Sequence, residues 1–362
     1  MNSILYTPYK IDGLEIKNRF TASAVFDYGA DNGKITGKIK KRYASLADGG
    51  TGMIISGMHA VRPEGGMGPF NATPKAEGYA EGLKEITEYA HKQAAKFFVQ
   101  LCHCGTSTSS AEGYDTLAVC ETKGRDGRTF HAATEEELKR IEEDFADSAR
   151  ICQQGGADGI EIHAAHGYLV NTFLSPVTNH RTDAYGGNAA NRARFLFEVY
   201  DAIRSAVGPE FIVGIKFPFN DLMENSIRPE DSLWTCRELE KRGIDFIEVT
   251  SGIAMSRESS STPRVTLEAQ APFAEYAREV ADAVSVPVIS VCGYRTPEAA
   301  EKVLTETKIS AVSLARPLIR EPDLPNRWKT DRSPAKCISC SHCFRSAADG
   351  IVTCQVEKAL NQ

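Results

Sequence analysis

The sequence predicts an α/β fold of the (β/α)8 or TIM barrel type, with an N-terminal β-hairpin and a short cysteine-rich tail. Eight short runs rich in β-branched and apolar residues recur along the chain, and helical patterns separate most of them. Each run is apolar throughout, as expected for strands that are buried on both faces and joined by helical crossovers. The length of 362 residues suits such a barrel, since about 250 residues are typical and extra length lies in loops.

The predicted strands follow a hairpin near the N-terminus. Residues 4–20 are predicted as two short strands joined at Asp12-Gly13, a dipeptide that favours hairpin turns. The barrel strands are expected at residues 20–25, 52–56, 97–101, 159–163, 211–217, 246–250, 286–291 and 311–315. An open doubly wound sheet would instead need a Gly-x-Gly-x-x-Gly turn after its first strand, and the sequence has none there.

Two helices carry clear start signals. Thr134 and Glu137 form a capping box, and apolar residues then recur at helical spacing until the chain reaches Gly155. A second helix is expected to begin at Pro297, because proline is preset for the first helical position.

Composition excludes several classes of protein. With 42% hydrophobic and 25% charged residues the chain is of the ordinary globular type. Its net charge of -6 argues against a nucleic-acid partner or an anionic membrane, since both favour a basic surface. The first ten residues lack the pattern of a signal peptide, and no apolar run reaches membrane-spanning length. We therefore expect a cytoplasmic protein, and we expect it to be a homo-oligomer.

The ten cysteines are distributed unevenly. Six are scattered through mostly apolar segments and are expected to be free thiols in the core, namely Cys102, Cys104, Cys120, Cys152, Cys236 and Cys292. The other four lie between Cys337 and Cys354, which indicates a metal site and not a disulfide framework. Prolines and charges around residues 320–334 mark a boundary, so residues 1–330 are predicted as the barrel and 331–362 as a metal-binding tail.

In a TIM barrel, functional residues gather at the C-terminal ends of the strands. The fourth predicted strand ends at His163, and His166 and Tyr168 follow on the same loop. Two neutral histidines can hold a carbonyl oxygen, and a nearby phenol can give up a proton. A histidine pair satisfied within the core is the alternative, and the polar residues at the other strand ends argue against it.

Those other strand ends suggest a phosphorylated ring as the ligand. Gly293 after the seventh strand allows close backbone approach, and Arg316 after the eighth adds a cation suited to phosphate. Gln100 can pair in both directions with an amide-like ring edge, and Lys216 can place positive charge beside a ring that becomes anionic on reduction. These are the requirements of a flavin.

With these residues in place, the chain resembles the old yellow enzyme family of FMN-dependent oxidoreductases over residues 3 to about 327. The matching segments are residues 14–20, 50–57, 100–105, 161–194 and 311–325. The run Ser-Pro-x-x-Asn-x-Arg-x-Asp-x-Tyr-Gly-Gly at residues 175–187 is the most specific of them.

The resemblance implies FMN at the barrel mouth and reduction of an alkene conjugated to a carbonyl, with hydride transfer from the flavin N5. By position it implies that His163 and His166 bind the carbonyl oxygen, that Tyr168 is the general acid and that Tyr28 contacts the substrate. The residues expected to bind the cofactor are Ser23, Ala24, Phe26, Gln100, Lys216, Gly293, Ala315 and Arg316. Lys216 stands where many members of the family have arginine.

One position departs from the family pattern. Where the family usually has Ser-Pro-Met followed by cysteine or threonine, this chain reads Ser23-Ala-Val-Phe26. Because a phenylalanine ring cannot donate the hydrogen bond that a small polar residue gives the flavin, we expect an altered flavin potential or a shifted substrate pocket.

The tail predicts an iron–sulfur cluster. Cys337, Cys340 and Cys343 form a Cys-x-x-Cys-x-x-Cys run, and Cys354 can supply a fourth thiolate, as a [4Fe–4S] cluster requires. Zinc is the alternative, although it usually prefers two separated Cys-x-x-Cys pairs. The tail is similar to the cluster segment of larger relatives, bacterial dienoyl-CoA reductase and trimethylamine dehydrogenase, whose later dinucleotide-binding domains are missing from this sequence.

The sequence thus predicts an FMN and iron–sulfur ene-reductase for small α,β-unsaturated carbonyl compounds. Electrons would come from a ferredoxin or a flavoprotein partner subunit, or NAD(P)H would reduce the flavin directly and leave the cluster structural. Oxidation of a small amine, reduction of a dienoyl thioester, and a role as an electron-transfer subunit of a larger complex are the alternatives.

Overall fold

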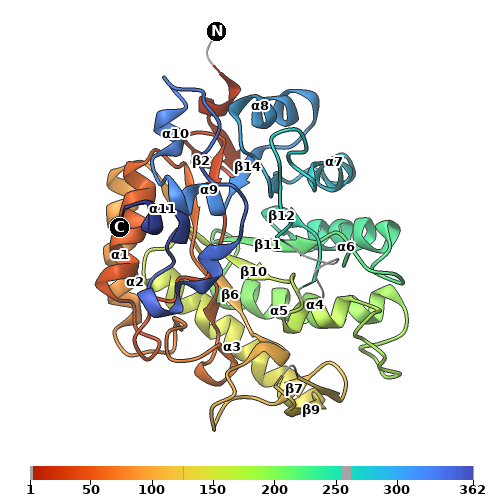
Figure 1. The fold of residues 1–362 in the computed structure, drawn as a ribbon. Coiled ribbons are helices and arrows are strands. Elements are labelled where there is room, and N and C mark those ends of the chain that lie inside the picture. Colours follow the sequence, from red (N-terminus) through yellow and green to blue (C-terminus); the bar gives the residue numbers. More distant parts are fainter. Residues whose placement is uncertain (1–2, 125, 254–261, 362) are drawn as a thin grey trace.

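Eight parallel strands close into a barrel in the computed structural model, which describes residues 3–124, 126–253 and 262–361 (Figure 1). The strands pair in chain order, and the pairing of β10 with β6 completes the ring. Their bounds are β3 Phe20–Ala22, β4 Met53–Ile55, β6 Lys96–Cys102, β10 Gly159–His163, β11 Ile212–Pro218, β12 Phe246–Thr250, β13 Val288–Val291 and β14 Ala311–Leu314. The predicted barrel is therefore confirmed.

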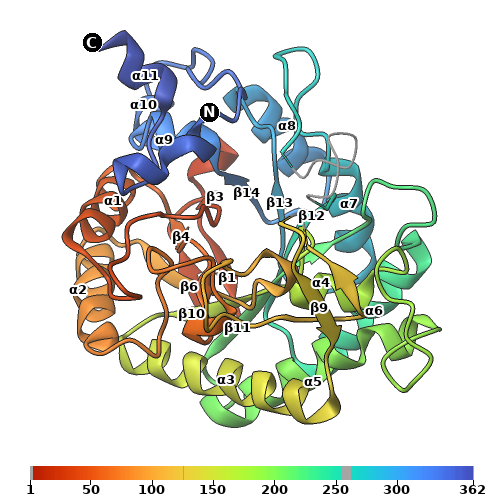
Figure 2. The same ribbon diagram turned by 60° about the horizontal axis from the view of Figure 1, so that its bottom comes forward.

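Helices surround this barrel (Figure 2). They are α1 Gly37–Asp48, α2 Tyr79–Lys92, α3 Glu135–Gln154, α4 Leu169–Leu174, α5 Ala189–Val207, α6 Pro229–Arg242, α7 Ala274–Ala283, α8 Pro297–Glu306, α9 Arg316–Arg320 and α10 Leu324–Arg327. Both predicted helix starts are confirmed. The capping box of Thr134 and Glu137 is formed at α3, and the Thr296 side chain accepts from the Ala299 N–H at the start of α8.

The hairpin closes the end of the barrel at which the strands begin. Strands β1 (Tyr9–Ile11) and β2 (Leu14–Ile16) pair antiparallel across Asp12 and Gly13, whose positive φ values of 41° and 81° are those of a tight hairpin turn. The prediction was wrong for Ile4–Tyr6, which form a 3-10 helix. The Ser3 side chain caps that helix by accepting from the Leu5 N–H, and this local bond competes with extended backbone.

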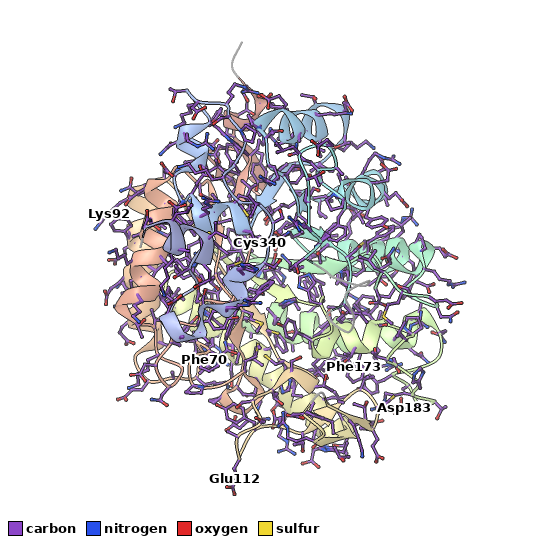
Figure 3. The ribbon with its side chains drawn as sticks, viewed as in Figure 1. Phe70, Lys92, Glu112, Phe173, Asp183 and Cys340 are labelled. Atoms are coloured by element: carbon purple, nitrogen blue, oxygen red, sulfur yellow. The ribbon has the colours of Figure 1, made fainter. Side chains whose placement is uncertain are left out.

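Two apolar cores lie on either side of the strands. The larger one fills the layer between strands and helices, where Phe173 is fully buried, while Lys92 and Glu112 project from the surface (Figure 3). The smaller one fills the interior of the barrel next to the hairpin. It includes Phe98 and Phe246, whose rings meet edge to face at 5.6 Å.

Short additional elements lie in the loops that follow β4 and β6, and the sequence did not predict them. They comprise β5 (His59–Ala60), the 3-10 turns Pro63–Gly65 and Gly105–Ser107, and the strands β7 (Leu117–Ala118), β8 (Thr122–Lys123) and β9 (Thr129–Ala132).

The cysteine-rich tail folds back onto the barrel mouth. It contains the 3-10 segment His342–Asp349 and helix α11 (Gln355–Leu360), drawn in dark blue in Figure 1. The Val352 N–H donates to the Asp27 carbonyl at 2.8 Å, and the Arg295 guanidinium donates to the Ala335 carbonyl at 3.1 Å. In the part of the chain described, none of the helices is long and apolar enough to span a membrane.

Candidate active site

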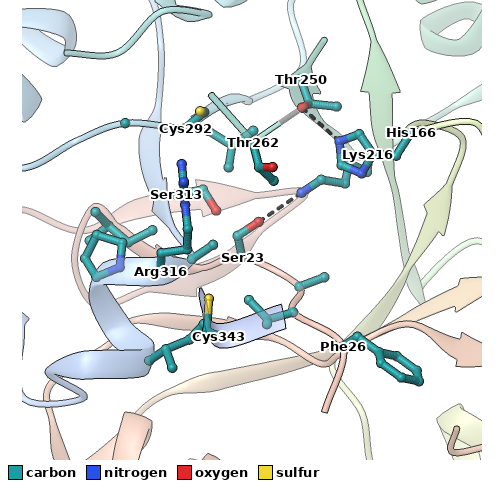
Figure 4. Close-up of a pocket in the computed structure, with 18 of the residues that line it drawn as sticks. Ser23, Phe26, His166, Lys216, Thr250, Thr262, Cys292, Ser313, Arg316 and Cys343 are labelled. Carbon is teal, nitrogen blue, oxygen red and sulfur yellow. Dashed lines mark hydrogen bonds between the residues drawn. The ribbon is translucent and has the colours of Figure 1, made fainter. Parts of the chain in front are cut away.

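A cavity of about 640 Å³ opens at the C-terminal ends of the barrel strands (Figure 4). Eleven of the twelve residues predicted to bind cofactor or substrate line it, namely Ser23, Ala24, Phe26, Gln100, His163, His166, Tyr168, Lys216, Gly293, Ala315 and Arg316. The closed parallel barrel brings them together because every strand delivers its last residues to the same rim.

Three side chains from the end of β10 and the loop after it form one wall of this cavity. The His163 ring lies 5.2 Å from the His166 ring and 4.8 Å from the Tyr168 ring, centroid to centroid, and both contacts are edge to face. His166 takes a positive φ of 64° before Gly167 at 81°, and this turn brings the second imidazole back beside the first. The three groups therefore point into one small volume.

Both histidines are neutral. Burial lowers the pKa of His163 well below its ordinary value, and the neighbouring His166 and Lys216 lower it further. Burial, with Lys216 adding to it, lowers the pKa of His166 to about 3. The Ala165 N–H donates to His163 Nδ1 at 3.3 Å, so the neutral ring carries its proton on Nε2. His166 Nε2 contacts Thr250 Oγ1 at 3.1 Å.

Tyr168 remains protonated at neutral pH. Burial raises the pKa of its phenol well above the ordinary value, and the nearby thiols of Cys104 and Cys102 act in the same direction. Its ring packs partly buried against a small cluster that contains Met58 and these two cysteines. A phenol in this position can donate a proton only to a strongly basic acceptor.

Polar side chains of β6 and β11 form the floor of the cavity, and buried carboxyl groups of β10 and β12 lie behind them. Gln100 Nε2 donates to Glu161 Oε2 at 2.6 Å. Lys216 Nζ donates to Ser23 Oγ at 2.9 Å and forms a buried ion pair with Glu248. Gln100 and Lys216 are thus held in fixed positions beneath any ring that occupies the cavity.

The wall formed by β13 and β14 is suited to an anion. Gly293 has a φ of 85°, and a Cβ there would lie 2.7 Å from Pro272 Cδ, so only glycine fits. Ser313 Oγ is buried without a hydrogen-bond partner among the described residues. Arg295 and Arg316 line the cavity, and Arg316 also donates to the Ser339 carbonyl at 3.2 Å. Arg316 therefore also fastens the tail to this wall.

Aromatic side chains lie at the mouth. The Phe26 ring meets the Tyr28 ring edge to face at 4.7 Å and the Phe70 ring at 5.9 Å. Tyr28 was predicted to contact the substrate, but it is not among the residues that line the cavity. Its hydroxyl donates to the Phe344 carbonyl of the tail at 3.1 Å.

The four tail cysteines line a second, small cavity next to the first. Cys337, Cys340, Cys343 and Cys354 all border it, and Cys343 borders the large cavity as well. The thiols are not gathered into a preformed site: across the described ranges, no group of three or more His, Cys, Asp or Glu side chains is positioned to hold a metal ion.

Comparison with known proteins identifies the family. The sequence profile of the NADH:flavin oxidoreductase / NADH oxidase family matches residues 4–334. The chain belongs to this family, the old yellow enzyme family. The resemblance noted in the sequence is therefore confirmed.

Individual relatives show how much of each protein is shared. A metal reductase of Desulforamulus reducens is 31% identical over 96% of this chain and 52% of its own length. The structure of a 2-naphthoyl-CoA reductase in complex with 2-naphthoyl-CoA superimposes with a TM-score of 0.88 at 25% identity, covering 98% of this chain and 56% of that chain. An old yellow enzyme homologue from Zymomonas mobilis gives a TM-score of 0.77 at 25% identity, covering 91% of this chain and 94% of that chain. This member of the family thus spans about half the length of the first two.

The cavity fits the flavin of this family. Its volume of about 640 Å³ lies within the ordinary range for cofactor sites, which is roughly 300–1,000 Å³. The floor offers an amide and a cation, and the anion wall offers the unpartnered Ser313 hydroxyl beside two arginines. FMN needs both kinds of contact, because polar groups must bind the edge of its ring and cations or donors must bind its phosphate.

Several residues of the site were missed in the sequence. Glu248 interrupts an otherwise apolar strand, and a lone carboxylate in such a strand is a usable signal for a buried polar partner. Ser313 and Thr250 likewise lie at strand ends and line the cavity. Ser339 and Phe344 carry no such signal, because only the folding of the tail onto the barrel brings them to the cavity.

Proposed function

We propose that this chain is an FMN-dependent ene-reductase that reduces the C=C bond of α,β-unsaturated carbonyl compounds. The observation that carries the proposal is the convergence, in one cavity, of two neutral histidines, a protonated phenol and a floor suited to a flavin. When bound, FMN supplies the hydride for this chemistry. The remaining steps depend on side chains of the chain itself.

The histidines bind the carbonyl oxygen of the substrate. The Nε2–H of His163 is the free donor of that ring, because Nδ1 accepts from the backbone. His166 donates through Nδ1 when the Thr250 hydroxyl donates to its Nε2. Addition of hydride at the β-carbon builds negative charge on the oxygen, and two donors aimed at that oxygen stabilise the charge as it develops.

Tyr168 completes the reduction by protonating the α-carbon. Its phenol is a weak acid in this buried position, but the enolate of the substrate is basic enough to take the proton. In this assignment Ser23, Ala24, Phe26, Gln100 and Lys216 surround the flavin ring, and Gly293, Ala315 and Arg316 surround its phosphate.

The tail is proposed to hold a [4Fe–4S] cluster that relays electrons to the flavin. Support comes from four thiols around one cavity and from Cys343, which borders that cavity and the flavin cavity together. Cys337, Cys340, Cys343 and Cys354 would be the ligands, and zinc is the rival metal. A ferredoxin or a flavoprotein partner would then deliver electrons to the cluster. In the alternative route, NAD(P)H would reduce the flavin directly and the cluster would be structural.

Metal and flavin analysis of anaerobically purified protein tests this assignment. We expect one FMN, four irons and four sulfides per chain, with iron lost in Cys343→Ser. Cys236→Ser is the matched control, because Cys236 is a fully buried thiol of α6, outside the tail. Zinc without iron would contradict the electron relay, and absence of flavin would contradict the whole proposal.

A thioester substrate is a second candidate. It is favoured by the similarity to 2-naphthoyl-CoA reductase, which extends over 98% of the chain at a TM-score of 0.88. Parallel assays with a simple enone and with the corresponding enoyl or aroyl thioester distinguish the two. A higher kcat/KM for the thioester supports the second candidate, and a higher value for the enone supports the first.

A further inference from the structure

Directly behind the floor of the flavin cavity, two buried carboxyl groups lie beside a single cation among the residues that the structure describes. Glu161 and Glu248 are both 0% exposed, and Lys216 between them is 4% exposed. The three residues come from the successive strands β10, β11 and β12, where Lys216 is in register with Glu248. Below them the apolar interior with Phe98 and Phe246, closed by the hairpin, keeps water away.

The contacts divide the two carboxyls into different roles. Lys216 Nζ bonds Glu248 Oε2 and Ser23 Oγ, whereas Glu161 Oε2 accepts from the Gln100 amide at 2.6 Å. The second oxygen of each carboxyl, Oε1, receives no donor from the described residues. These two oxygens can bond to each other only if one of the carboxyls carries a proton.

The charge balance requires this proton. Two ionised carboxylates beside one ammonium group, both carboxylates being 0% exposed, would leave one buried negative charge unpaired. Among the described residues, the other titratable groups near these three are His163 and His166, which are neutral, the Cys292 thiol, whose pKa burial raises to about 11, and the buried phenol of Tyr9. Burial raises the pKa of Glu161 well above its ordinary value, and the charge of Glu248 raises it further.

We propose that Glu161 and Glu248 are positioning residues for the flavin: Glu248 is the carboxylate that neutralises Lys216, and Glu161 is a neutral acid that donates to Glu248 and orients the Gln100 amide. Because the Gln100 NH2 group is held by Glu161, its carbonyl oxygen is the atom offered to the ring. The flavin then sits above a compensated cation and an acceptor, with no unpaired negative charge beneath it. This inference rests on the proposed function.

The neutral carboxyl of Glu161 predicts only a small change in the flavin potential when this residue is replaced. Glu161→Gln replaces a neutral group by another neutral group, so the ratio of reduced to oxidised FMN at a given potential changes less than tenfold, or about 30 mV for two electrons. In Glu248→Gln the carboxylate beside Lys216 is removed, and Glu161 loses its proton to neutralise the cation in its place. Glu142→Gln is the control, because Glu142 is a buried glutamate of α3 outside the barrel interior. A shift of more than tenfold in Glu161→Gln would overturn the proposal.

Infrared spectroscopy provides a readout that needs no flavin. A neutral carboxyl has a carbonyl stretch that shifts between H2O and D2O, and we expect one such band to be lost in Glu161→Gln and retained in Glu142→Gln. The band should also be lost in Glu248→Gln, because Glu161 ionises there. If that variant does not fold, Glu161→Gln alone decides, and persistence of the band in Glu161→Gln refutes the shared proton. A wild-type chain without flavin refutes the proposed function instead, and the band still tests the acid pair in the apoprotein.

Discussion

Tyr168 is the residue on which the last chemical step depends. Tyr168→Phe keeps the ring contact with His163 at 4.8 Å and removes only the hydroxyl. Because a positioned acid contributes about 10²–10⁴-fold, we expect oxidation of reduced flavin by an enone to slow by that factor while flavin binding is unchanged. Stopped-flow absorbance measures this rate, with the exposed Tyr89→Phe as control. A rate equal to wild type would remove Tyr168 from the mechanism.

Phe26 is the residue at which the chain departs from its family. Its ring borders the cavity and packs against Tyr28 and Phe70. Phe26→Cys opens space at the mouth and returns a polar group beside the flavin, so we expect kcat/KM for bulky relative to small enones to rise by about tenfold, or the flavin potential to shift. A variant in which both the potential and the substrate range equal those of wild type would contradict this interpretation.

His59 links protonation to stability away from the active site. Burial lowers its pKa from 6.5 to about 3, and its Nδ1 contacts the Tyr79 hydroxyl at 2.5 Å. Between these pH values the unfolded chain binds one more proton than the folded chain, so stability falls as the pH is lowered from 6.5 towards 3. His59→Gln should reduce this slope by about 1.4 kcal/mol per pH unit.

Denaturant unfolding at several pH values between 4 and 6 measures that slope. The variant also loses a hydrogen bond, so the slope, and not the stability at one pH, is the decisive quantity. An unchanged slope would show that His59 is not a source of the acid sensitivity.

At the scale of elements, glycines in the strands make the barrel interior possible. A Cβ on Gly214 of β11 would lie 2.1 Å from Phe246 Cε1 of β12. The Phe246 ring belongs to the core inside the barrel and leaves no room for this Cβ. Gly214→Ala should therefore destabilise the fold by about 1–3 kcal/mol through overpacking. Urea unfolding measures this loss. Gly37→Ala at the start of α1 is the control, since its Cβ meets nothing within 4 Å, and an equal effect of both variants would contradict the packing argument.

Elements with a local cause could be predicted from the sequence. The Asp12-Gly13 turn and the capping box at Thr134 depend on residues close in the chain, and both formed where expected. Strand positions were also predictable, because buried apolar runs identify them. Strands such as β7 and β8 have two residues each, and nothing in so short a segment distinguishes them from loop before the tertiary contacts are known.

At the scale of the whole molecule, the barrel topology made most of the active site predictable. Once eight parallel strands close, residues at their C-terminal ends must share one rim, which is why His163, Lys216 and Gly293 meet. The place of the tail was not predictable, since it depends on long-range bonds such as Tyr28 to Phe344. That bond also occupies the hydroxyl that the sequence had assigned to substrate.

This chain covers different shares of its relatives. It spans about half of the metal reductase and of the 2-naphthoyl-CoA reductase, but nearly all of the old yellow enzyme homologue from Zymomonas mobilis, of which it covers 94%. The tail reaches the flavin cavity through Cys343, which lies outside the barrel. Comparing reduction by NADH, by NADPH and by a reduced ferredoxin in the presence and absence of iron would determine which route the chain uses.

Ene-reductase activity is tested most directly by reducing the bound flavin and then oxidising it anaerobically with a simple enone such as cyclohex-2-enone, with product analysis. We expect rapid return of the oxidised flavin spectrum and formation of the saturated ketone, with the carbonyl intact. Failure of both enones and enoyl thioesters to oxidise the flavin, or formation of the allylic alcohol, would contradict this activity.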